Sequence, residues 1–258
     1  MKREIIESIL EGYSSISLAE MDSVRLMNRI DTKYTIPFSL LPEILKRFQT
    51  DYLIQDINGS LINTYRTLYL DTTDRAMYLD HHNGRRTREK IRVRSYHDSQ
   101  TIYLEVKHKN NKGRTKKKRI MLPDEIAYKL QDAKAFLEKH AKYSQDLLLP
   151  KLENSFYRIT LVNKKKTERI TIDANLAFCN PSDGVEKQMD DLVIIELKQT
   201  GFMPSFAKSI LSDMHVHPVK FSKYCIGTIL TAPDVKYNRF KERIIQLNRI
   251  RKQQYGFV

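Results

Sequence analysis

Residues 90–96 read KIRVRSY and residues 103–109 read YLEVKHK, and in both stretches charged and apolar side chains alternate. In a β-strand, this period of two puts the charged side chains on one face and the apolar ones on the other. The charged faces carry Lys90, Arg92, Arg94 and Tyr96 in the first stretch, and Tyr103, Glu105, Lys107 and Lys109 in the second. For a strand taken at random, such a basic face looks into water. The rest of the chain has to show whether these faces instead point inward.

The composition is typical of a globular protein with a strongly basic surface or site. Of 258 residues, 41% are hydrophobic and only 8 are Gly and 8 Pro, which supports a real core and argues against long flexible linkers. The 45 Lys and Arg exceed the 31 Asp and Glu by 14. This excess predicts an anionic partner, which could be nucleic acid, a phosphorylated metabolite, a polyanion or an acidic membrane surface.

The sequence shows no targeting or membrane-spanning pattern. Its N-terminus, MKREIIESILEGY, has no uninterrupted apolar segment, and the longest apolar runs are far too short for a membrane span. Cys179 and Cys225 are isolated and lack the spacing of a metal site, so we expect two reduced thiols. These features predict a cytoplasmic protein.

Alternating patterns predict eight strands, and short polar turns between several of them indicate an antiparallel meander. The predicted strands are 31–36, 65–71, 89–97, 101–109, 115–122, 155–163, 168–174 and 192–199. Eight strands can close into a barrel that just holds side chains and a small ligand. We therefore predict an α+β fold built on an eight-stranded antiparallel β-tunnel.

Helical periodicity predicts the elements around this sheet. The predicted helices are 2–10, 17–29, 38–48, an insert at 123–145, 203–214, 222–231 and a basic helix at 238–253. The insert is expected to bury Ile126, Leu130, Ala133 and Leu137. No repeat or linker divides the chain, so residues 1–258 are predicted to form one domain. It would comprise N-terminal helices at about 1–30, tunnel strands at about 31–200 and C-terminal helices at about 203–253.

The chemistry of the candidate site comes from side chains. The sequence contains no glycine-rich phosphate loop, GxSxG elbow or HExxH zinc helix. Separate strands instead contribute basic residues at alternating positions, namely Lys33, Arg92, Arg94, Lys107, Arg158 and Arg169. If these faced inward, only a polyanionic ligand would make the arrangement tolerable, because burying an unpaired charge is costly. Glu196 and Lys198 repeat the spacing of Glu105 and Lys107, and a carboxylate among these cations could hold a divalent metal on phosphate oxygens.

From about Arg29 to Gly227, the ordered series RIDTKY, LYLDT, KIRVRSY, LEVKH, KKKR, YRIT, ERITID, IIELK and VKFSKY carries a resemblance. It resembles the VTC (vacuolar transporter chaperone) polyphosphate polymerase domain, a branch of the triphosphate tunnel metalloenzymes. The resemblance implies a basic tunnel that binds triphosphate or polyphosphate. It also implies transfer of the γ-phosphate of ATP to a polyphosphate chain with Mn²⁺ or Mg²⁺.

The same resemblance implies roles for individual residues. The implied catalytic residues are Lys33, Arg92, Arg94 and Lys107. The implied phosphate-binding residues are Lys118, Arg158, Arg169, Lys198, Lys220 and Lys223, with Lys118 favoured among Lys116, Lys117 and Lys118. Glu196 is the implied metal ligand, with Glu105 as the next candidate. Asp71 is expected to end a strand and cap the next helix, and so to lie outside the site.

Two departures from the family bear on function. The hydrolytic branch carries ExExK on the first strand, whereas here the same face reads Arg29, Asp31 and Lys33, which weakens the case for a simple triphosphatase. A triphosphate or NTP hydrolase and a non-catalytic binder of polyphosphate or RNA remain alternatives, although nucleic acid is not the expected partner. The membrane helices of the yeast-type polymerases are not found, which leaves open an association with a separate membrane protein. The helix at 238–253 could contact an anionic membrane or the emerging polymer.

Overall fold

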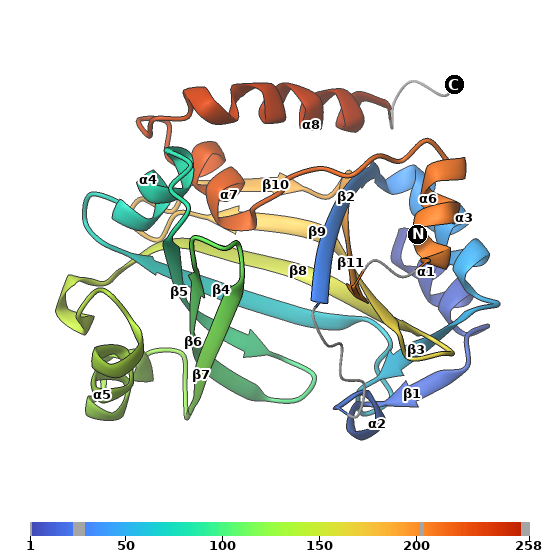
Figure 1. Cartoon of the computed structure of the whole chain (residues 1–258), viewed down its shortest axis with the longest axis horizontal. Coiled ribbons are helices and arrows are strands. Elements are labelled where there is room, and N and C mark those ends of the chain that lie inside the picture. Colours follow the sequence, from blue (N-terminus) through green and yellow to red (C-terminus); the bar gives the residue numbers. More distant parts are fainter. Residues whose placement is uncertain (1, 23–28, 202–203, 254–258) are drawn as a thin grey trace.

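The computed structural model describes residues 2–22, 29–201 and 204–253. All eight predicted strands are present (Figure 1). They are β2 (Arg29–Pro37), β4 (Asn63–Asp71), β5 (Arg88–Tyr96), β6 (Thr101–Lys109), β7 (Thr115–Leu122), β8 (Leu149–Asn163), β9 (Glu168–Cys179) and β11 (Leu192–Thr200). They form one sheet in the order β2-β11-β9-β8-β4-β5-β6-β7, and every neighbouring pair on this path is antiparallel.

Three shorter strands extend this sheet at its margins. They are β1 (Ser15–Ser17), β3 (Tyr52–Asp56) and β10 (Glu186–Met189). β3 pairs with β8, β10 pairs with β9, and β1 pairs with β3 in parallel. The sequence does not predict these strands, because three to five residues are too few to show an alternating pattern.

The sheet curls strongly, so that one of its faces is enclosed (Figure 1). β6 and β11 are separated by four strands in the sheet order, yet the charges of Lys107 on β6 and Glu196 on β11 interact across the enclosed space. We call the face that bears these two residues the inner face. Within the described ranges no ladder joins the edge strands β2 and β7, so the predicted tunnel is not closed by backbone hydrogen bonds.

Helices cover the outer face on the side of β2, β11, β9 and β8. They are α1 (Lys2–Leu10), α3 (Leu41–Phe48), which follows the turn η1 (Phe38–Leu40), and α6 (Phe206–Asp213). The apolar side of α3 is fully buried at Leu41, Ile44, Leu45 and Phe48, against Ile170 and Ile195 among others, and Leu40 of η1 is partly buried beside it. The helix predicted at 17–29 begins as α2 (Leu18–Asp22), and residues 23–28 lie outside the described residues. Alternation along the strands thus sends apolar side chains outward to these helices and charged ones inward.

The insert covers the outer face of β5, β6 and β7. It consists of η2 (Ala127–Lys129), α5 (Gln131–His140) and η3 (Gln145–Leu147), and Ala133 and Leu137 are fully buried as predicted. The prediction was wrong for Ile126 and Leu130, which are 71% and 57% exposed. Both precede a helical segment and do not lie within it, because η2 starts after Ile126 and α5 after Leu130.

A second group of helices closes one end of the inner face. It comprises α4 (Ala76–His82), α7 (Lys223–Thr231), η4 (Asn238–Phe240) and α8 (Lys241–Gln253). Tyr224 of α7 stacks on Tyr69 of β4 at 4.9 Å between centroids, and its hydroxyl donates to Asp71 at 2.5 Å. Asp71 also accepts from the backbone N–H groups of Met77 and Tyr78, both at 2.9 Å, so it caps α4 as predicted. The inner face is therefore apolar under α7 and charged beyond it.

No helix in the described part of the chain combines the length and the apolar character needed to cross a membrane.

Candidate functional site

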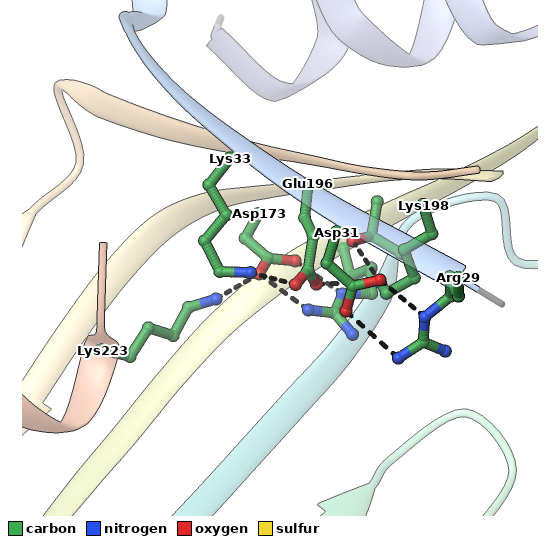
Figure 2. A network of polar contacts seen from close by, with 9 residues as sticks. Arg29, Asp31, Lys33, Asp173, Glu196, Lys198 and Lys223 are labelled. Atoms are coloured by element: carbon green, nitrogen blue, oxygen red, sulfur yellow. Dashed lines mark hydrogen bonds and ion pairs between the residues drawn. The ribbon is translucent and has the colours of Figure 1, made fainter. Parts of the chain in front are cut away.

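Glu196 lies between two lysines of the inner face. The antiparallel register sets it directly opposite Lys33 of β2, and its carboxylate forms ion pairs with Lys33 and, at 2.8 Å, with Lys198 (Figure 2). Burial by itself raises the pKa of Glu196, but the charges of Lys198 and Lys33 hold the pKa well below its ordinary value. Glu196 is therefore ionised, and its charge is shared between two cations.

Asp173 of β9 is the second carboxylate of the cluster, and it is not among the site residues predicted from the sequence. It accepts from Arg158 Nε at 2.6 Å and Nη2 at 2.7 Å, and it pairs with Lys223 (Figure 2). Burial would raise the pKa of Asp173, yet Arg158 and Lys223 lower it. The stretch ERITID contained the signal, because Asp173 stands on the same face as Arg169 and Thr171 by strand alternation.

Lys223 stands at the first residue of α7, with its Nζ 3.9 Å from the centroid of the Phe156 ring. Burial lowers the pKa of Lys223 to about 7, against the opposing effect of the Asp173 charge. The ammonium of Lys223 can therefore gain or lose its proton near neutral pH.

Glu105 of β6 is the third carboxylate, and its side chain is fully buried. It accepts from Arg92 Nε at 2.8 Å and Nη2 at 2.5 Å, and from Lys117 Nζ at 3.2 Å. Burial raises the pKa of Glu105, but Arg92, Arg94 and Lys117 together bring the pKa well below its ordinary value. One buried carboxylate thus neutralises only part of the positive charge around it.

A further group of inner-face cations has no carboxylate within ion-pair distance among the described residues. It includes Lys90, Arg94, Lys107 and Arg169. Arg94 Nε donates to the Thr67 hydroxyl at 3.2 Å and Lys90 Nζ to the Ser222 hydroxyl at 2.8 Å, whereas Arg169 Nε is buried and has no hydrogen-bond partner in the described part of the chain. These side chains therefore have positive charge and N–H donors available for an anionic ligand.

The effect of this uncompensated charge is visible at Lys107. Its pKa is well below the ordinary lysine value, because the charge of Arg92, burial and the charge of Arg94 all disfavour its ammonium form. An anion bound between Arg94 and Lys107 would relieve this repulsion. The inner face is therefore arranged to hold a ligand with several negative charges.

One predicted residue, Lys118, does not face the cluster. Lys118 pairs in register with Val106, whose side chain lies in the outer core, so Lys118 is exposed on the opposite face. Lys117 pairs with Lys107 and faces inward, which corrects the choice of Lys118. Lys220 is exposed in the segment between α6 and α7, and its neighbour Val219 donates its backbone N–H to the carbonyl of Lys33 at 2.7 Å, so this segment runs beside β2. The other predicted residues all lie on or at the inner face. They are Lys33, Arg92, Arg94, Lys107, Arg158, Arg169, Lys198, Lys223 and Glu196.

The carboxylates of the inner face do not form a metal site by themselves. The described ranges contain no group of three or more His, Cys, Asp or Glu side chains that could hold a metal ion. A magnesium-like ion carried by substrate phosphates, however, needs only one or two protein carboxylates. Glu196 fits that requirement better than Glu105, because its side chain is 20% exposed whereas Glu105 is fully buried.

The fold is α+β, with a curled antiparallel sheet of eight main strands, a charged inner face and flanking helices. The sequence profile of the VTC domain matches residues 28–231. This match spans most of the chain, so the chain belongs to the VTC domain family.

Several solved structures are similar to this chain. A proposed adenylate cyclase of Bacillus halodurans is 14% identical, with a TM-score of 0.49, over 76% of this chain and 96% of its own. A proposed adenylyl cyclase of Hippeastrum, described as having a dominant triphosphatase activity, is 13% identical, with a TM-score of 0.44, over 77% and 94%. A Pyrococcus horikoshii protein is 11% identical, with a TM-score of 0.43, over 84% and 99%. No curated protein matches the chain significantly.

Proposed function

We propose that this protein is a polyphosphate polymerase-like phosphotransferase that moves the γ-phosphate of ATP onto inorganic polyphosphate. The observation that carries the proposal is the group of inner-face cations without carboxylate partners, with Arg94 and Lys107 at its centre. Membership of the VTC domain family supports phosphate compounds as the ligands. The cytoplasmic location stays a prediction from the sequence.

The proposed reaction needs little covalent chemistry from the protein. A terminal phosphate oxygen of the polymer attacks the γ-phosphorus, and the bond from that phosphorus to the β,γ-bridging oxygen breaks. ADP leaves with the electron pair, and the polymer is longer by one phosphate. Positioning of the two anions and stabilisation of the charge on the transferred group therefore carry the rate.

The residues of the inner face divide this work between them. Arg94 and Lys107 hold the transferred phosphate, because they can bind it without first breaking an ion pair with a described carboxylate. Arg92, Lys33 and Lys198 are anchored by carboxylates, which keeps their positions fixed and prevents excessive repulsion. Arg158, Arg169 and Lys223 extend the charged face along the chain of phosphates.

Glu196 would hold the divalent ion, Mn²⁺ or Mg²⁺, together with phosphate oxygens of the substrate. Such an ion, when bound, neutralises charge on the transferred group. Phosphate oxygens entering the site can replace Glu196 as partners of Lys33 and Lys198, which frees its carboxylate.

The first strand supports transfer over hydrolysis. At the positions where the hydrolytic branch resembled by the sequence carries two glutamates, β2 has Arg29 and Asp31, which pair with each other at 2.6 Å. Asp31 is thereby already neutralised by its neighbour.

The test is product analysis after incubation with ATP and Mn²⁺. We expect ADP and an acid-insoluble polymer of phosphate, in equal phosphate amounts. ADP with orthophosphate alone would replace the proposal by a hydrolase, and the absence of turnover with retained polyphosphate binding would replace it by a binder.

A further inference from the structure

The end of the inner face that lies away from α7 is lined by aromatic side chains. Strand register places Tyr103 of β6 between Arg94 of β5 and Met121 of β7. The ring of Tyr96 meets that of Tyr103 at 88° with the centroids 5.9 Å apart. The guanidinium of Arg119 lies over the ring of Tyr103, with its Cζ 4.4 Å from the centroid. These four side chains, Tyr96, Tyr103, Arg119 and Met121, form what we call the aromatic platform.

The aromatic platform is accessible to a ligand. Met121 is 59% exposed, Arg119 is exposed, and the two tyrosines are half-buried. At the other end of the inner face, Tyr69 of β4 stacks on Tyr224 of α7, and both rings are buried. A flat ligand therefore finds an open π-surface on the side away from α7.

The aromatic platform lies beside Arg94 and Arg92 of the inner face. Arg94 is the direct cross-strand neighbour of Tyr103, and Arg119 is that of Glu105, the partner of Arg92. Arg92 and Tyr96 are four residues apart on β5, which corresponds to roughly 13 Å along an antiparallel strand. A nucleoside triphosphate is long enough to set its phosphates on Arg92 and Arg94 while its base reaches the platform.

We propose that the aromatic platform binds the nucleobase of the nucleoside triphosphate donor. The inference rests on the proposed function, because it takes the phosphate chain of the donor to lie on Arg94 and Lys107. The base stacks on Tyr103 and on the planar guanidinium of Arg119, which itself stacks on aromatic faces. Stacking recognises the π-face of a base and not its edge, so ATP and GTP are bound alike.

The experiment compares two ligands that share the phosphates but not the base. Binding of ATP and of inorganic tripolyphosphate is measured by calorimetry without divalent metal, so that no turnover occurs. Tyr103→Leu removes the aromatic ring, and Arg119→Lys keeps the positive charge but removes the planar group. Tyr237→Leu is the matched control, because Tyr237 is 45% exposed and stands at the start of η4, outside the platform.

We expect Tyr103→Leu to lower ATP affinity by about ten- to a hundredfold, and Arg119→Lys by somewhat less, because base stacking on an aromatic side chain is of that size. Tripolyphosphate affinity should stay within about twofold in both variants, which also shows that they are folded. Equal losses for both ligands, or no loss of ATP affinity in either variant, would overturn the platform as a base site. Wild-type protein that binds neither ligand would overturn the proposed function itself.

Discussion

Arg92 and Glu105 form a buried ion pair in which one carboxylate oxygen, Oε2, accepts from both Nε and Nη2 of the arginine, at 2.8 and 2.5 Å. The second oxygen accepts from Lys117 Nζ at 3.2 Å. Two cations thus depend on one carboxylate, and beside them Arg94 and Lys107 have no ion-pair partner among the residues that the structure describes. This part of the inner face has fewer carboxylates than cations. A bound polyanion would supply the missing negative charge.

Replacement of Glu105 tests this dependence. We expect Glu105→Gln to lower the free energy of unfolding by about 3 to 5 kcal/mol, because it leaves a buried arginine without its counter-charge. Tripolyphosphate should restore more stability to the variant than it adds to the wild type, since it replaces the lost charge. Urea unfolding with and without tripolyphosphate measures both effects. Glu153→Gln is the control, because its partner Arg66 is 45% exposed and such a pair contributes at most about 1 kcal/mol. Equal losses in the two variants would contradict the inner-face interpretation.

Lys117 and Lys118 are neighbours in the chain on opposite faces of β7. We expect Lys117→Ala to weaken tripolyphosphate binding by roughly tenfold, the lower end of the range for a charge-assisted contact. Lys118→Ala should change it less than about twofold, because that side chain points to solvent on the outer face. Calorimetry at one fixed salt concentration is the measurement. If the two variants showed equal losses of tripolyphosphate affinity, the general positive charge of the surface would explain binding better than a defined site on the inner face.

Lys223 predicts a pH dependence of ligand binding. Its pKa is about 7 in the folded protein and near 10.5 when unfolded, so between these values the unfolded state binds more protons. The contribution of Lys223 to stability therefore rises with pH from about 7 to about 10.5, and is lost again as pH falls through 7. A phosphate ligand favours the ammonium form, so tripolyphosphate binding at pH 8 should take up a proton and weaken towards pH 9.

Calorimetry in two buffers of different ionisation enthalpy counts the protons taken up at pH 8. Lys223→Arg keeps the charge at every pH in this range, so the part of the proton uptake that Lys223 contributes should disappear in this variant, whereas Lys107, whose pKa is also lowered, keeps its own part. Unchanged uptake in Lys223→Arg would assign the titration to another group.

Glu196→Gln separates binding from turnover. The variant keeps the size of the side chain but loses the charge that would hold the metal, so Mn²⁺-dependent ATP turnover should be abolished. Polyphosphate binding should be unchanged or slightly tighter, because Lys33 and Lys198 lose a competing partner. Turnover at the wild-type rate and metal dependence would move the metal ligand elsewhere, with Glu105 next to be replaced.

The strands and their faces could be predicted from the sequence. In β5 and β6 the alternation of charged and apolar side chains has a period of two, and that period puts Arg92 and Arg94 on the charged face of β5 and Lys107 on the charged face of β6. The apolar positions between them, such as Val93 and Leu104, then require a cover on the other face. Local pattern is sufficient here because it reflects the geometry of a single strand.

Only the tertiary structure decided which charged side chains of different segments lie close enough to interact. Lys116, Lys117 and Lys118 are chemically alike in sequence, and a shift of one residue in register would turn a different lysine inward. Asp173 became a partner of Lys223 because α7 returns to the inner face some fifty residues later in the chain. Lys107 and Glu196 interact because the sheet curls through the four strands between them. Register, curvature and the packing of α7 depend on contacts between distant segments, and no local pattern of side chains encodes those contacts.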